Sequence, residues 1–432
     1  MNNVAPIRSS LPVLKVGKFS NFSVAILLII AFLLVIPILD VPMLGLSLTA
    51  PLIFLVAVEA LIRPPHPWSI IGLRYIILAV IVGAGIFTSL AVNGLSSGGT
   101  DIAYKGISTV IHYFFWLFAF VLTIYVISAG NLAQTISRVL GWSVLLLAIL
   151  RWGEVLVYGN IGAGSITHLQ TQNDYGFLFS TFSPFLLAMI FSEKKVDRFI
   201  AVPGSILLWG AAAVNGSRGS WVAIGVGIVF LLVLLLFSQP RKAVGTLFFI
   251  TIMAGSAYLA FSAFPRISQV VENRLITFQN LNEDKDYQIR LLEDQKAQRL
   301  FESSLWFGVG PGRFQVSIVQ LDIPQLLQYA AQSHFDVKSS HNSYLGFLAE
   351  DGLVGAMPLG ILLILLAVFG FFAAISLSRQ KKYWGIAVYS GFVGMSVHMW
   401  SIASLTNTAN WFIYGLVAAM IILARTESKG TK

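Results

Sequence analysis

The chain has 432 residues, of which 56% are hydrophobic and 11% are charged, and its formal net charge is +9. Soluble domains carry about 25% charged residues, so this composition, with a mean hydropathy of +0.80, excludes a soluble globular protein. Cysteine is absent, which excludes disulfides, thiolate catalysis and cysteine metal sites. The composition predicts an all-α protein that crosses a membrane many times.

Apolar runs near the length of about 20 residues that a bilayer requires occur along most of the chain. The polar, basic start leads into the first run without a small-residue cleavage site, so we expect a retained first helix rather than a signal peptide. About twelve spans are predicted, at 22–39, 43–62, 71–92, 107–128, 140–157, 174–192, 199–216, 220–237, 243–264, 353–376, 384–405 and 409–425.

Lysine and arginine are distributed unevenly between the two predicted sides of the membrane. With the N-terminus in the cytoplasm, inside segments hold 17 of the 28 basic residues, whereas the short outside loops hold only Lys105 and Arg218. The positive-inside rule therefore predicts cytoplasmic N- and C-termini and an outer position for the long polar segment 265–340. We interpret the basic excess as a topology signal and expect no nucleic-acid partner.

The long polar segment divides the chain into three predicted parts. Residues 1–264 hold the first nine spans, 265–340 form a periplasmic loop, and 341–432 hold a histidine motif and the last three spans. Within the loop, apolar residues occur at helical spacing from Tyr287 to Phe307, and Gly308-Val-Gly-Pro-Gly312 ends this helix. We expect amphipathic helices that cover the membrane helices.

Polar residues near the fifth and sixth spans each have two interpretations. Arg151 and Glu154, spaced i, i+3, predict a structural pair within one helix; alternatively, Arg151 faces a cavity. Asn173 and Asp174 predict a cap for the sixth span, and the alternative is that they bind a polar ligand.

Residues 215–221, Asn-Gly-Ser-Arg-Gly-Ser-Trp, predict a tight turn on the outer side of the membrane. An arginine in this turn opposes the charge bias of the other short outer loops. This favours anion binding by Arg218, because a guanidinium group pairs with phosphate oxygens in a bidentate way. The alternative is that Arg218 extends to lipid headgroups.

His341 lies where the polar segment meets the following apolar run. An imidazole at a boundary between water and membrane can exchange a proton near neutral pH and can act as a general base. The alternative is that His341 caps or solvates the start of a helix.

No metal or other cofactor is predicted. Asp284-Lys-Asp286 matches the acidic pair with which nucleotide-sugar transferases hold a metal, but the match is only three residues long. The space outside the membrane also lacks nucleotide sugars. The six histidines form no metal-ligand spacing with a carboxylate.

Three features in this order resemble the bacterial O-antigen ligase and O-antigen polymerase superfamily. Twelve spans with one large loop between the ninth and tenth fit the same pattern, and the likeness covers about residues 170–425. The features are Arg218-Gly219 in a short outer turn, then Arg290 followed by Ala297, Phe301 and the glycine motif 308–312, and finally His341-Asn342 followed by nine residues, Gly352 and Gly355.

The resemblance implies a GT-C-like membrane glycosyltransferase of the bacterial inner membrane with a periplasmic active site. Its donor would be a glycan linked to undecaprenyl diphosphate, and its acceptor would be a sugar hydroxyl of lipid A–core, with membrane lipids around both. The transfer would be inverting and would need neither metal nor ATP. His341 would be the catalytic base and Arg218 and Arg290 would bind the diphosphate. Possible further substrate contacts are Asn342, Tyr344 and Arg313.

The order of these features favours the ligase branch, and several alternatives stay open. One is a polymerase of O-antigen or exopolysaccharide that acts on lipid-linked repeat units, and another is a protein-glycosylating member. A lipid or polysaccharide transporter is the alternative of another class. Transporters show repeats and broken helices near the midplane, whereas the polar residues of this chain gather at one predicted face. Arg266 and Arg274 are expected to be solvated charges, and the alternative is that they assist with phosphate or saccharide. His334 could substitute for His341 but lies off the family pattern.

Overall fold

The computed structural model describes residues 21–36, 49–62, 70–93, 100–128, 132–159, 161, 171–262, 264–314, 340–403, 405 and 407–430. These residues form helices and no strands, which confirms the predicted all-α class. The helices are α1 (Asn21–Val35), α2 (Thr49–Ile62), α3 (Ile70–Asn93), α4 (Thr100–Ser128), α5 (Leu132–Tyr158), α6 (Gln172–Ala188), η2 (Met189–Phe191), α7 (Lys195–Asn215), α8 (Arg218–Ser238), α9 (Pro240–Ser262), α10 (Pro265–Gln279), η3 (Leu281–Glu283), α11 (Lys285–Ser303), α13 (Ser343–Arg379), α14 (Trp384–His398) and α15 (Thr408–Gly430).

Each predicted span overlaps one of these helices. Among the described residues, eight helices are long and apolar enough to cross a membrane, namely α3, α4, α5, α6 with η2, α7, α8, α13 and α15. The chain is therefore a polytopic membrane protein, whereas the number twelve stays a prediction. The clearest difference concerns the span predicted at 353–376, because α13 begins at Ser343, well before that run.

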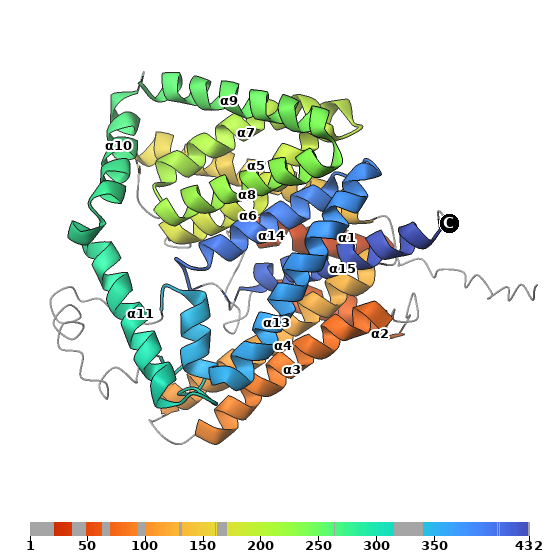
Figure 1. Cartoon of the computed structure of the whole chain (residues 1–432), viewed down its shortest axis with the longest axis vertical. Helices are drawn as coiled ribbons and strands as arrows, with labels where there is room; N and C mark the ends of the chain where they lie inside the picture. Colours follow the sequence, from red (N-terminus) through yellow and green to blue (C-terminus); the bar gives the residue numbers. More distant parts are fainter. Residues whose placement is uncertain are drawn as a thin grey trace, which may run out of the picture.

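Helix α6 forms the centre of one half of the bundle. All residues from Tyr175 to Ala188 are buried, since α6 packs against α5, α7, α8 and α14 on its different sides. Four phenylalanines, Phe177, Phe179, Phe182 and Phe185, fill this space. In the other half, α13 packs against α3 and α15, and α15 packs against α4 (Figure 1).

Helix α13 contains a break at Gly352, where the backbone has φ 60° and ψ −164°. A break of this kind frees backbone N–H and C=O groups that a continuous helix would pair with each other. The segment after α11 pairs with these groups. The backbone N–H groups of Leu353 and Val354 donate to the carbonyl oxygens of Leu305 and Trp306, at 2.9 and 3.0 Å.

Two further backbone hydrogen bonds run in the opposite direction, from Val309 to Ala349 and from Gly310 to Glu350, both at 2.9 Å. Gly308, Gly310 and Gly312 all have positive φ. Helix α11 ends at Ser303, four residues before the predicted end at Phe307, and the turn with these glycines follows. A Cβ at Gly308 would lie 2.3 Å from the carbonyl oxygen of Glu350. The two backbones therefore come this close only because glycine occupies the position.

Helices α10 and α11 follow each other along the outside of the bundle, at the left edge of Figure 1. The C-terminal end of α11 is held by the glycine turn on α13, and its N-terminal end is held by an ion pair between Asp284 and Arg218, with 2.5 Å between Oδ2 and a guanidinium nitrogen. These contacts at both ends hold α11 beside the N-terminal ends of α8 and α13. The described part of the predicted loop is thus helical and packed on the bundle.

Replacement of Gly352 by alanine is expected to destabilise the protein. Its Cβ would lie 2.5 Å from the backbone nitrogen of Gly308, at a positive φ that alanine rarely adopts. We expect a loss of about 2 kcal/mol or more of unfolding free energy, measured as a lower melting temperature by tryptophan fluorescence. The matched control is Gly360→Ala in the same helix, where a Cβ meets no atom within 4 Å. Equal melting temperatures for the two variants would contradict the proposed docking.

Candidate active site

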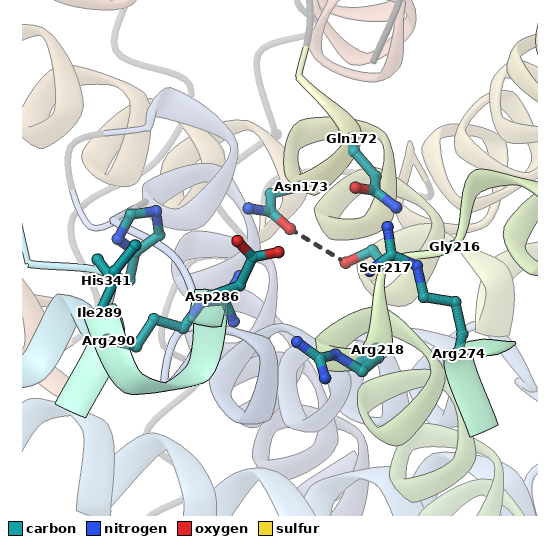
Figure 2. A pocket seen from close by; sticks show the side chains of 10 residues that line it. All are labelled: Gln172, Asn173, Gly216, Ser217, Arg218, Arg274, Asp286, Ile289, Arg290 and His341. Atoms are coloured by element: carbon teal, nitrogen blue, oxygen red, sulfur yellow. Dashed lines mark hydrogen bonds between the residues drawn. The ribbon is translucent and has the colours of Figure 1, made fainter. Parts of the chain in front are cut away.

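A polar cavity of about 190 Å³ lies where α10 and α11 meet the bundle. Its side chains come from the start of α6, the turn between α7 and α8, α10, α11 and His341, which lies two residues before α13 (Figure 2). The lining residues are Gln172, Asn173, Gly216, Ser217, Arg218, Arg274, Asp286, Ile289, Arg290 and His341. The cavity thus joins the predicted arginines and the predicted histidine, which are far apart in sequence.

The turn between α7 and α8 is tied to the start of α6. The side chain of Gln172 donates to the carbonyl oxygen of Asn215 at 2.6 Å, and Asn215 Nδ2 donates to the carbonyl oxygen of Gln172 at 2.8 Å. Ser217 Oγ donates to Asn173 Oδ1 at 3.2 Å, as Figure 2 shows. Gly216 has φ 72°, a left-handed conformation that ends α7 and lets α8 begin at Arg218.

Arg218 projects from the first residue of α8 and donates to Asp284. The Arg218 hydrogen bond lowers the pKa of Asp284 below its usual value of 3.8. Asp284 also caps α11, because its Oδ1 accepts the backbone N–H of Tyr287 at 2.9 Å. Asp284 therefore serves as a helix cap and an arginine partner.

Within the described residues, no group of three His, Asp or Glu side chains is arranged to hold a metal ion.

Arg290, in the middle of α11, and Arg274, in α10, add two guanidinium groups to the cavity. Burial, followed by the positive charge of Arg218, lowers the pKa of Arg290. The carboxylates of Asp286, Glu293 and Asp284 act electrostatically on Arg290 and offset part of the repulsion between the two arginines. An anion bound between Arg218 and Arg290 would relieve their mutual repulsion, and two guanidinium groups suit phosphate oxygens in particular.

His341 reaches the edge of the cavity from the residues that precede α13, and its side chain is 30% exposed. Its Nδ1 lies 2.5 Å from Oε2 of Glu293, a glutamate of α11 whose side chain is only 1% exposed. Glu293 is not among the site residues that the sequence predicts. Its position three residues after Arg290 places the two side chains on one helix face. Other acidic residues of this charged segment also lie three or four residues from a basic residue, so the spacing does not distinguish Glu293.

The family model described as O-antigen ligase matches residues 203–360. This match, which spans 158 of the 432 residues, supports the O-antigen ligase superfamily for this part of the chain. The matched range covers α8 to α11 and the first part of α13, so it contains Arg218, Arg274, Arg290 and His341. No curated protein gives a significant match to the chain. The cavity therefore combines groups that can bind an anion with a histidine that can accept a proton.

The other three predicted substrate contacts have structural partners within the chain. Asn342 caps α13, since its Oδ1 accepts the backbone N–H groups of Tyr344 and Leu345 at 3.1 and 3.2 Å. The Tyr344 hydroxyl donates to the carbonyl oxygen of Ser396 at 2.9 Å. Arg313 donates to the carbonyl oxygen of Asn93 at 2.9 Å, and it does not line the cavity. The structure thus does not bring these three residues to the site.

The predicted structural pair is confirmed, since Arg151 and Glu154 form an ion pair within α5, at 2.8 Å. The predicted cap of α6 is confirmed in part: Asp174 forms a capping box with Thr171, whereas Asn173 lines the cavity. Arg274, expected to be a solvated charge, instead lines the cavity. His334 and the side chain of Arg266 lie outside the described residues.

The ion pair between Arg218 and Asp284 predicts a pH-dependent contribution to stability. Because the folded-state pKa of Asp284 lies below its usual value of 3.8, the contribution is fully present above that value and is lost as the pH falls through the lowered pKa. Asp284→Asn keeps a good helix cap but removes the charge. We expect a loss of about 1.5 to 3 kcal/mol at pH 7.

This prediction is tested by melting temperatures of the wild type and Asp284→Asn between pH 2 and pH 7. Glu302→Gln, a change at an exposed glutamate of the same helix, serves as the control and is expected to leave the curve unchanged. The two curves for wild type and Asp284→Asn should converge at the acidic end. A constant offset at every pH would instead assign the effect to packing.

Proposed function

We propose that the chain is an O-antigen ligase, which moves a glycan from undecaprenyl diphosphate to a sugar hydroxyl of lipid A–core. The match to the O-antigen ligase family model supports this reaction class in general. The observation that carries the specific proposal is the convergence of Arg218, Arg290 and His341 on one polar cavity. These residues supply the two functions that the reaction needs, stabilisation of a leaving diphosphate and removal of a proton from the acceptor.

In this proposal, Arg218 and Arg290 bind the diphosphate of the donor. Negative charge develops on the diphosphate as its bond to the sugar breaks, and fixed guanidinium groups in a partly buried site stabilise that charge. The diphosphate would take the place of Asp284 as a partner of Arg218. The energy for transfer comes from the donor itself, so the reaction has no requirement for ATP.

His341 acts as the general base in this proposal. Its imidazole removes the proton of the acceptor hydroxyl while the acceptor oxygen attacks the anomeric carbon. A bond from acceptor oxygen to carbon forms, the bond from carbon to diphosphate oxygen breaks, and its electron pair leaves with the diphosphate. A single displacement of this kind inverts the anomeric centre.

The distribution of basic residues supports a periplasmic position for the cavity in the inner membrane. Helix α8 begins at Arg218 in the cavity, and α13 begins beside His341, so the other ends of both helices lie away from the site. There, Lys242 donates to the Tyr383 hydroxyl and Arg379 donates to the carbonyl oxygen of Phe237. Basic residues gather at this end, as the positive-inside rule expects for the cytoplasm: Lys194, Lys195, Arg198, Arg241, Lys242, Arg379, Lys381 and Lys382.

The proposed activity is tested with purified protein, an undecaprenyl-diphosphate-linked glycan and lipid A–core, in EDTA and without ATP. The expected product is lipid A–core that carries the glycan. Longer lipid-linked chains with unchanged lipid A–core would instead assign the protein to the polymerase alternative. Absence of any covalent product with either acceptor would contradict a transferase.

Substitutions in the cavity should separate the two proposed roles. We expect His341→Ala to lower the transfer rate by about 10²-fold to 10⁴-fold, the range of general base catalysis, with little change in inhibition by inorganic diphosphate. Arg218→Gln and Arg290→Gln should each lower the rate by about 10²-fold to 10³-fold and also weaken inhibition by inorganic diphosphate.

The matched control for the arginine variants is Arg299→Gln, at an exposed position of α11, which should retain wild-type rates and inhibition. If Arg218→Gln and Arg290→Gln retained full sensitivity to inorganic diphosphate, the assignment of these arginines to the donor would be wrong.

A further inference from the structure

We propose that Glu293 is a positioning residue for His341, which orients its imidazole and compensates the positive charge that forms on it during transfer. The inference rests on the proposed function, in which His341 is the general base. The sequence of this chain alone does not separate Glu293 from the other acidic residues of the segment. The contact between Glu293 on α11 and His341, two residues before α13, distinguishes it.

The hydrogen bond fixes which nitrogen of His341 can act as the base. An ionised carboxylate only accepts hydrogen bonds, so the 2.5 Å contact requires a proton on Nδ1, which donates to Glu293 Oε2. In the neutral imidazole, Nε2 then carries a free lone pair that can take the proton of an acceptor hydroxyl. The backbone N–H of His341 also donates to Glu293 Oε2, at 3.4 Å, which fixes the carboxylate further.

Both partners are held by rigid elements. Helix α11 is anchored at its two ends by the Asp284–Arg218 ion pair and by the glycine turn on α13. The start of α13 is held by a hydrogen bond from the Ser343 backbone N–H to the carbonyl oxygen of Met399, at 2.9 Å. If the imidazole rotated, its hydrogen bond to Glu293 would be lost, because the anchored helix α11 keeps the carboxylate in place.

Glu293 interacts electrostatically with Arg290, and its ion pair within the described residues is the one with His341. Its side chain is buried, and its Oε1 has no hydrogen-bond partner among the described residues. Lys296, one turn further along α11, is also buried, and burial lowers the pKa of its ammonium group to about 7. The lysine is therefore only partly charged near neutral pH. An imidazolium on His341 would compensate the glutamate charge directly, at hydrogen-bond distance.

The proton balance of the step follows from this arrangement. The acceptor hydroxyl gives its proton to Nε2 of His341, its oxygen bonds to the anomeric carbon, and the diphosphate leaves with the electron pair of the broken bond. Glu293 keeps its charge throughout and stabilises the imidazolium, as a buried carboxylate does in catalytic triads. Glu293 thus acts through His341 and does not touch the substrate.

The test compares Glu293→Gln, His341→Ala and the double variant in the transfer assay with undecaprenyl-diphosphate-linked glycan and lipid A–core. We expect Glu293→Gln to lower kcat by about 10²-fold to 10⁴-fold, up to the loss caused by an amide in place of the triad carboxylate, with KM for both substrates unchanged. In the His341→Ala background, Glu293→Gln should change the residual rate by less than about 2-fold, because residues that act as a unit are not additive.

Glu302→Gln, at an exposed position of α11, is the matched control and should behave as wild type. Glu293→Asp, which keeps the buried charge, should retain more activity than Glu293→Gln. If Glu293→Gln melts too low to assay, the ratio between Glu293→Asp and wild type, measured in both His341 backgrounds, gives the same comparison.

The possible results separate this inference from the proposed function. Loss of transfer in His341→Ala with full activity in Glu293→Gln would overturn the role of Glu293 alone. Additive effects of the two substitutions would also overturn it, since they would indicate a structural role. Full activity of His341→Ala would remove the proposed base, and the role of Glu293 would fall with it.

Discussion

The site depends on the backbone contact between the turn that follows α11 and the break in α13. Four hydrogen bonds join residues 305–310 to residues 349–354, and glycines at 308 and 352 allow the two backbones to approach. Ser89 of α3 completes the junction, since its hydroxyl lies 2.5 Å from the carbonyl oxygen of Phe307 and 2.9 Å from that of Glu350. This contact fixes α11 on the membrane helices and so brings Arg290 and Glu293 beside His341.

The two ends of α11 are held in different ways, and the difference matters for function. The end near the glycine turn is held by backbone hydrogen bonds, which no bound anion can replace. The other end is held by the ion pair between Asp284 and Arg218, in which a phosphate can compete for the guanidinium group. A rigid end thus places the histidine and its glutamate, while an exchangeable ion pair lies where the proposed donor binds.

Residues of similar type or position in the sequence have different roles around the cavity. Arg274 and Arg313 both lie in the polar segment after the ninth predicted span, yet Arg274 lines the cavity and Arg313 binds the backbone of α3. Asn342 directly follows His341, yet it caps α13. The position of each residue on its helix or turn decides whether its side chain reaches the cavity. Residues with similar places in the sequence therefore have different structural roles.

The sequence by itself determined the membrane class, the helices, the break after α11 and the resemblance that singled out Arg218, Arg290 and His341, because hydropathy, glycine and motif order are local properties of the chain. Only the tertiary structure decided which charges meet. The pairing of Glu293 with His341 joins residues 48 positions apart, and that of Asp284 with Arg218 joins residues 66 apart. Such contacts depend on how α11 lies across the bundle, which no local pattern encodes.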